Sequence, residues 1–144
     1  MTFNNITKDT TCNCFIDTAE DITSTYARVL NKEKATDKDF LSKWEKNQRD
    51  TDCEVVCLLK GVSISKIADD SIKSKVIKYY SGIFKISPKY KKGILLFKFK
   101  KDAGVLKATP SRDNPDHNTL YKSDSFVLSL VEEIETCYLN PIVV

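Results

Sequence analysis

Five cysteines and one histidine are the side chains of this 144-residue sequence best suited to chemistry. Cys12 and Cys14 form one close pair, Cys53 and Cys57 form another, and Cys137 stands apart. Four thiolates can hold a tetrahedral zinc ion, so the two pairs, Cys12, Cys14, Cys53 and Cys57, are the candidate metal ligands. We expect the Cys12-x-Cys14 spacing to point its thiols to opposite faces of an extended segment, which disfavours zinc. No cofactor is therefore expected.

An odd number of cysteines excludes complete pairing into disulfides within one chain. The favoured interpretation is a reduced compartment, in which Cys53 and Cys57 share a helical face and are buried as small apolar residues. A third interpretation is a nucleophilic cysteine, which needs a base, but the single histidine, His117, lies in a turn-rich loop. We expect a protein without enzymatic activity, and a cysteine-dependent enzyme remains an alternative.

Lysine dominates the basic residues, and it is unevenly distributed along the chain. All but three of the 23 basic residues are lysines, and the formal net charge is +3. Lysine lacks the planar fork with which arginine reads phosphate and guanine, so this charge is weak evidence for nucleic acid. Residues 85–107 carry eight lysines and one acid, whereas residues 108–144 carry two basic and six acidic side chains. The sequence is thus polarised in charge.

The basic segment predicts a lysine-rich hairpin that contacts a partner. Its expected contact residues are Lys89, Lys91, Lys92, Lys98, Lys100, Lys101 and Lys107. Leu95, Phe97 and Phe99 would share one face of the first strand and Lys98 the other, so only the first face is expected in the core. Opposed charges on neighbouring segments can steer a charged partner or favour self-association. We therefore expect a binding protein whose partner is a protein, bound by this hairpin or by an acidic C-terminal helix.

Nucleic-acid binding through Lys85–Lys107 is the alternative function. Lys92-Gly93 followed by Phe97-x-Phe99 overlaps part of the RNA-recognition signature, on a sheet face. A stretch similar to a helix-turn-helix precedes the hairpin, which would then be the wing of a winged-helix-like domain. Both matches are partial, and neither assigns the chain to a family. Binding by lysines alone would be independent of sequence and would weaken with salt.

Hydrophobic periodicity predicts the elements that would carry these residues. Apolar residues at helical spacing predict helices over 18–30, 36–44, 67–82 and 125–139, and residues 53–59, which also fit a strand, are read as a fifth. Trp44 is the expected core anchor of the second helix. Alternation predicts strands over 83–86, 94–100 and 103–108, of which the last two form the hairpin. Residues 110–118 are expected to be an exposed loop.

Residues 1–144 are expected to form a single domain, with residues 1–16 as an irregular N-terminal segment. The expected fold class is α+β, with helices packed on a small antiparallel sheet that contains the lysine-rich hairpin. The composition, 41% hydrophobic and 30% charged, is typical of a globular chain. No apolar run approaches the roughly 20 residues of a membrane-spanning helix, and no secretory signal is recognised. We expect no membrane partner and a cytoplasmic location.

Overall fold

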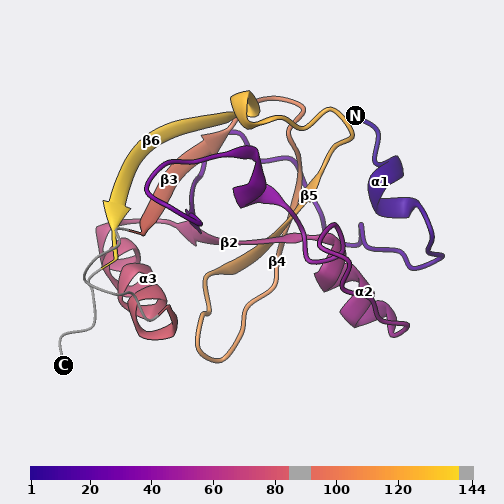
Figure 1. Ribbon diagram of the computed structural model, residues 1–144, viewed down its shortest axis with the longest axis horizontal. Helices are drawn as coiled ribbons and strands as arrows, with labels where there is room; N and C mark the ends of the chain where they lie inside the picture. The colour runs from indigo at the N-terminus through magenta and orange to yellow at the C-terminus, as the bar shows by residue number, and fades with distance from the viewer. Residues whose placement is uncertain (85–91, 140–144) are drawn as a thin grey trace.

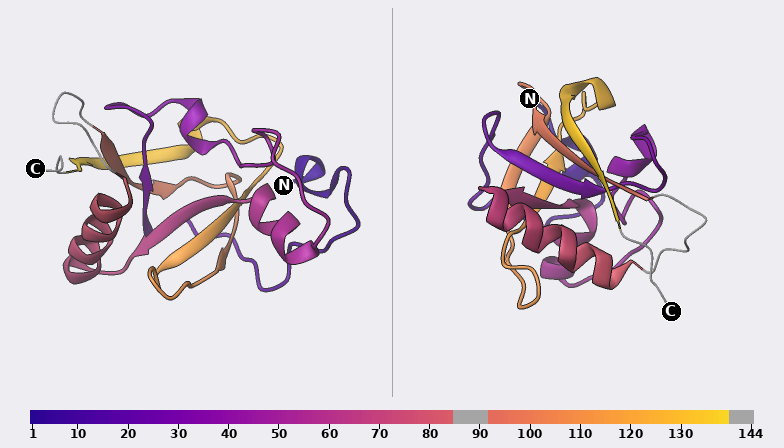
Figure 2. Two further views of the ribbon diagram at one scale, coloured as in Figure 1. Left: turned by 60° about the horizontal axis from the view of Figure 1, so that its bottom comes forward. Right: turned by 90° about the vertical axis from the view of Figure 1, so that its left-hand side faces the viewer.

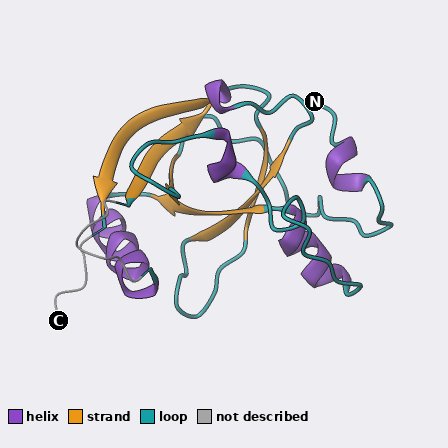
Figure 3. Ribbon diagram, in the orientation of Figure 1, coloured by secondary structure: helices purple, strands orange, loops and turns teal. Residues whose placement is uncertain are grey.

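Strands make up most of the regular structure of this protein. The computed structural model describes residues 1–84 and 92–139, and there six strands form one antiparallel sheet in the order β4-β5-β2-β1-β3-β6 (Figure 1). The strands are β1 (Thr25–Val29), β2 (Val62–Ile67), β3 (Gly93–Phe99), β4 (Gly104–Ala108), β5 (His117–Lys122) and β6 (Val131–Tyr138). The α-helices of this part of the chain are α1 (Asn4–Thr7), α2 (Cys53–Lys60) and α3 (Asp70–Ile83), and two 3₁₀ turns are η1 (Asp37–Phe40) and η2 (Leu128–Leu130). Figure 3 shows how little of the chain is helical.

The expected α+β fold, with helices packed on a small sheet that contains a lysine-rich hairpin, is wrong. Residues 94–100 and 103–108 do form strands, but β3 pairs with β1 and β6, whereas β4 pairs with β5. Three other strands lie between β3 and β4 in the sheet order, so the two do not form a hairpin. β5 was not predicted. The loop expected over 110–118 ends at Asp116, and the chain becomes extended from His117.

The helix expected over residues 18–30 is a turn followed by β1. The Asp21 carboxylate accepts hydrogen bonds from the main-chain N–H groups of Thr23 and Ser24, each at 3.0 Å, and from the Tyr26 hydroxyl at 2.7 Å. An Asp that binds its own following backbone in this way favours a turn over a helix start. The next residues include the β-branched Thr25 and Val29 and pair with strands on both sides, so tertiary pairing overrides the helical spacing.

The helix expected over residues 125–139, with its acidic face, is the 3₁₀ turn η2 followed by the strand β6. Val127, Val131 and Ile134 are β-branched, and such residues are compatible with either structure when their spacing alone is considered. Pairing with β3 over seven registered positions decides in favour of the strand. Only Val131 of β6 is buried, so the apolar stripe that predicted a helix does not form a packed face.

The helix expected from Thr36 to Trp44 stops after one 3₁₀ turn. Asp39 is buried, and its carboxylate accepts from the main-chain N–H of Thr36 at 2.7 Å and of Asn31 at 2.6 Å. Phe40 enters the core, whereas Trp44 is only half-buried. The Arg49 guanidinium lies 4.1 Å and the Lys60 ammonium 4.6 Å from the centre of the Trp44 ring. Trp44 is therefore not the core anchor that the sequence suggested.

Two of the expected helices are confirmed, with shifts at their ends. The helix expected over 53–59 is α2, and the helix expected over 67–82 is α3. Asp52 caps α2 by accepting from the main-chain N–H of Glu54 and Val55, and Asp69 caps α3 by accepting from Ile72 N–H. The strand expected over 83–86 begins inside α3, and its last two residues lie outside the described residues. Among the described residues, no helix is long and apolar enough to cross a membrane.

Both faces of the sheet are covered, which corrects the expectation that only the Leu95 face of β3 is core. One face carries a cluster to which all six strands contribute, from Leu106 on β4 to Val131 on β6, so the sheet must curve around it (Figure 2). The other face of β1 and β3 packs against α3, with Val76 among the helix residues and Ile94 among those of the sheet. A smaller third cluster joins the N-terminal segment to α2 and β5, at the end of the molecule away from α3.

Candidate functional site

The lysines expected to contact a partner lie in three places, as far as the structure describes them. Lys92 precedes β3, with its ammonium 5.0 Å from the centre of the Phe84 ring. Lys98, Lys100 and Lys101 lie at the opposite end of β3 and in the connection to β4. Lys107 lies on β4 and lines a hollow beside the cysteines of α2. The remaining two, Lys89 and Lys91, lie outside the described residues. Their role as contacts stays a prediction.

The acidic and basic segments of the sequence lie side by side in the sheet. Lys98 of β3 is directly opposite Glu132 of β6, and Phe97 is opposite Glu133. Opposite charges at facing positions of neighbouring strands attract each other. Part of the separation of charge along the sequence is therefore balanced inside the molecule, and it no longer argues by itself for a charged partner.

β6 is an edge strand with most of its side chains in solvent. Residues 132–136 are all exposed, and Ile134, at 51% exposure, is one of the most exposed large apolar residues described. A bulge between Leu96 and Phe97 in the β3 register leaves Ile134 without a facing partner. Within the described part of the chain, β6 has a neighbouring strand on one side only. Its outer main-chain groups and its acidic side chains are thus available at the surface.

Glu135 of β6 has side-chain contacts that Glu132 and Glu133 lack among the described residues. The Glu135 carboxylate accepts from the Lys73 ammonium of α3 at 2.9 Å and from the Cys137 thiol at 3.2 Å. The hydrogen bond from Lys73 holds the pKa of Glu135 below its usual value. Burial, with the nearby Glu135, raises the pKa of the Cys137 thiol, so this free cysteine is protonated at neutral pH. Glu132 and Glu133 form no ion pair within the described residues.

The four candidate zinc ligands form two disulfides, Cys12–Cys53 and Cys14–Cys57. The expectation of reduced, buried cysteines is wrong. The argument that Cys12 and Cys14 point apart is also wrong, because residues two apart in an extended segment share a face. That shared face meets Cys53 and Cys57, which lie one turn apart on α2. No group of three metal-ligating side chains occurs among the residues that the structure describes.

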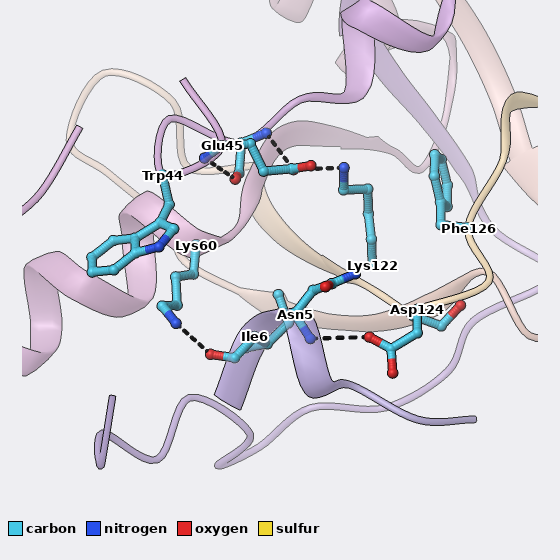
Figure 4. A pocket seen from close by; sticks show the side chains of 10 residues that line it. Asn5, Ile6, Trp44, Glu45, Lys60, Lys122, Asp124 and Phe126 are labelled. Atoms are coloured by element: carbon cyan, nitrogen blue, oxygen red, sulfur yellow. Dashed lines mark hydrogen bonds and ion pairs between the residues drawn. The ribbon is translucent and has the colours of Figure 1, made fainter. Parts of the chain in front are cut away.

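A small polar cavity of about 120 Å³ lies where the N-terminal segment meets the rest of the domain (Figure 4). Lys60 is buried at its edge, with its ammonium 4.6 Å from the centre of the Trp44 ring. This ammonium donates to the carbonyl of Ile6 at 2.7 Å and to the carbonyl of Lys8. Burial lowers the pKa of Lys60, while nearby Asp9 opposes the shift.

The other charges of this cavity are also satisfied within the chain. The Lys122 ammonium lies 2.6 Å from the Glu45 carboxylate. Burial alone would raise the pKa of Glu45, but hydrogen bonds from Lys122 and Ser42 hold it below its usual value. Asp124 accepts from the Thr2 hydroxyl at 2.6 Å and from two main-chain N–H groups of α1 at 3.0 Å. We conclude that the cavity anchors the N-terminal segment and offers no unpaired charge to a ligand.

We expect low pH to weaken the hydrogen bonds by which Asp124 holds the N-terminal segment. Its hydrogen bonds from Thr2, Asn5 and Asn4 lower the pKa of Asp124 below the ordinary value of 3.8. A carboxyl whose pKa is lowered by folding stabilises the folded state at pH values above its ordinary pKa. This stabilisation is lost as the pH falls through the folded-state pKa. An NMR titration should show Asp124 titrating below 3.8, with faster exchange of the Asn4 and Asn5 amides once it is protonated. In an Asp124→Asn variant these amides should exchange faster already at neutral pH, whereas Asp113→Asn, in an exposed loop, should leave them unchanged.

Comparison of the chain with protein-family models, with curated proteins and with solved structures finds no match. The function must therefore be inferred from the geometry of this chain alone.

Two features that bear on function were not predicted from the sequence. The first is that the acidic C-terminal segment is an edge strand, for which the β-branched Val131, Ile134 and Thr136 were the available signal. The second is Arg28, one of only three arginines, which lies beside a basic cavity described below. No local pattern marks Arg28, because its partners come from segments far away in the sequence.

Proposed function

We propose that this protein is a non-catalytic binding protein that engages an extended, basic segment of another protein along the outer edge of β6. The observation that carries the proposal is the run of exposed residues 132–136 on an edge strand that has only one neighbouring strand in the described residues. Such an edge presents unpaired main-chain groups to which a further strand can add. β6 contributes little to the core, so a role at the surface accounts for its length.

The side chains of β6 favour a basic partner. Glu133 is exposed and lies opposite the uncharged Phe97, so it attracts lysine and arginine. Glu132 is also exposed and, although Lys98 lies opposite, it forms no ion pair in the described part of the chain, so it adds to this attraction. Ile134, between Glu133 and Glu135, offers apolar area at 51% exposure. Self-association through two copies of β6 is disfavoured, because it would bring like charges together.

The alternatives have less support. Nucleic-acid binding through Lys85–Lys107 needs a continuous basic surface, and the described lysines lie in three separate places. A cysteine-dependent enzyme needs a free thiolate, and Cys53 and Cys57 are in disulfides. Disulfides persist in oxidising compartments, so we propose such a compartment in place of the expected cytoplasm.

A peptide of alternating lysine and valine is the probe that tests the proposal. We expect it to bind the intact, oxidised protein, to slow amide exchange in β6, and to bind more weakly as salt increases. Changing both Glu132→Lys and Glu133→Lys should weaken binding at least ~10-fold, because like charges then face the peptide. The control Asp113→Lys makes a charge change of the same sign in an exposed loop, and it should have little effect.

Three outcomes would contradict this function. They are equal binding of a glutamate–valine peptide, protection of a segment other than β6, and a dimer that forms through β6 without any peptide. Binding of DNA or RNA that is lost when Lys98, Lys100 and Lys101 are changed to Glu would favour the nucleic-acid alternative instead.

A further inference from the structure

A second cavity, of about 250 Å³, lies where β1 and β2 separate. The two strands pair from Thr25↔Ile67 to Ala27↔Ser65, and no further pair joins them beyond this point in the described residues. β1 continues along β3, while β2 continues along β5. The gap between the strands is closed from outside by the segment that contains Leu41 and by the end of α2 at Leu58.

Arg28 spans this gap in place of a strand pairing. Its Nε donates to the carbonyl of Asp39 at 2.8 Å, and its Nη1 donates to the carbonyl of Ser63 at 2.8 Å. Both acceptors are neutral, and the Asp39 carboxylate is already bound by two main-chain N–H groups. The Nη2 of Arg28 makes no hydrogen bond to any described residue. Arg28 is therefore a fixed guanidinium, held by two carbonyls, with donors left over.

Three further basic side chains line the same cavity, Lys43, Lys46 and His117. The Nδ1 of His117 lies 2.8 Å from the Thr109 hydroxyl and 3.1 Å from the Thr109 carbonyl, whereas its Nε2 has no hydrogen-bond partner in the described part of the chain. Burial lowers the pKa of His117, and although the Thr109 carbonyl opposes this, the charges of Arg28 and Lys43 add to it. The basic groups thus lie close enough to repel one another.

The cavity has no acidic residue among those that line it. The polar cavity beside Trp44 differs in this respect, because there Glu45 balances Lys122. Apart from Gly61 and Ser63, the rest of the lining is apolar, with Leu41 and Leu58 among its members. A fixed guanidinium, two lysines and an apolar wall suit a ligand that carries an oxyanion on a small apolar body.

We propose that this cavity binds a small organic oxyanion, whose carboxylate or phosphate lies between Arg28, Lys43 and Lys46 and whose apolar body packs on Leu41 and Leu58. Arginine pairs with either group through parallel N–H donors, and the lysines add charge. The site is separate from β6, so its test is independent of the proposed protein partner.

Phenyl phosphate and benzoate, with benzylamine as the cationic counterpart, are the probes for this site. Because His117 is the only histidine, its imidazole resonances report directly on the cavity in an NMR titration of the intact, oxidised protein. We expect both anions to shift these resonances saturably and benzylamine to have no effect. The tighter of the two anions identifies the ligand group, and inorganic phosphate should bind more weakly than phenyl phosphate if the apolar wall contributes.

Substitution of the lysines tests the charge requirement without disturbing the strands. Lys43 and Lys46 are exposed, and their ammonium groups form no hydrogen bond to the residues that the structure describes, so Lys43→Met with Lys46→Met should fold normally. We expect the double variant to bind the tighter anion at least ~10-fold more weakly. The control Lys75→Met, on an exposed position of α3, should bind as the unchanged protein does.

The proposal is wrong if neither anion shifts the His117 resonances at concentrations of about 10 mM, because any remaining affinity would then be negligible. It is also wrong if benzylamine binds equally well or if the double variant keeps full affinity. Arg28→Lys is a second variant, which retains the charge and loses the planar fork. Should it fold, as judged by its circular dichroism, unchanged affinity would overturn the role given to the guanidinium.

Discussion

Removal of both disulfides is expected to lower the free energy of unfolding by about 4 kcal/mol. Cys12–Cys53 and Cys14–Cys57 span 41 and 43 residues. In the chain-entropy account, a loop of this length restricts the unfolded chain by that amount. The two loops are nearly the same loop, so whichever disulfide is present already holds the ends together. Removing only one disulfide should therefore lower the free energy of unfolding by much less than half of this amount.

The structural consequence of reduction should be local to the N-terminal segment. Ile6 and Cys14 are buried against Tyr121 of β5 in a cluster separate from the main core. Without the disulfides this cluster depends on the bonds of Lys60 and Asp124, while the six-stranded sheet retains its own core. We expect residues 1–16 to become accessible to protease before the sheet unfolds.

Urea unfolding of the oxidised protein, of the reduced protein and of a Cys12→Ser, Cys53→Ser variant measures these differences. Cys137→Ser is the matched control, and it should change the unfolding free energy little. Alkylation of the unfolded, non-reduced chain gives an independent check, because only Cys137 should react. Labelling of more than one cysteine, or equal stability of the oxidised and reduced forms, would contradict the pairing.

Phe97→Ala is expected to lower the free energy of unfolding by about 4 kcal/mol. Phe97 is fully buried on β3, and its ring lies 5.5 Å from that of Phe40 and 5.1 Å from that of Phe99. Its removal leaves a cavity at the centre of the cluster that all six strands share, where neighbouring strands cannot close in.

The comparison variants for Phe97→Ala are Trp44→Ala and Ile134→Ala. Trp44 is half-buried and stacked against cations, so its loss should cost less than half as much as the loss of Phe97. Ile134 is 51% exposed, and its truncation should change stability by less than ~0.5 kcal/mol. Chemical denaturation of the three variants ranks them. A larger effect at Trp44 than at Phe97 would restore Trp44 as the core anchor.

The sequence was most informative where local chemistry and tertiary structure agree. α2 and α3 begin at Asp caps that are visible in the sequence, and β3 has an uninterrupted apolar run. Local signals failed where the same residues suit two structures. The β-branched residues of β6 can be spaced as in a helix, and only the presence of β3 alongside them decides.

The candidate sites were less predictable than the fold. Cys12 and Cys14, two apart in an extended segment, and Cys53 and Cys57, one helical turn apart, are spacings that suit two parallel disulfides. The odd number of cysteines excludes complete pairing but is compatible with two disulfides and one free thiol, Cys137. The basic cavity was not visible at all, since Arg28 and His117 meet only after β1, β2 and β5 assemble.

The connection between β3 and β4 is too short for the sheet to be flat. Four spacings between neighbouring strands separate β3 from β4 in the sheet order, or about 19 Å if the sheet were flat. The five steps from Phe99 to Gly104 reach at most about 18 Å, and the turn closed by Ala103 N–H and the Lys100 carbonyl shortens this reach. Ser123, the residue after β5, fixes the same turn by donating its hydroxyl hydrogen to the carbonyl of Asp102 at 2.7 Å. The length of this one loop therefore limits how flat the sheet can be, and with it the width of the interior that Phe97 fills.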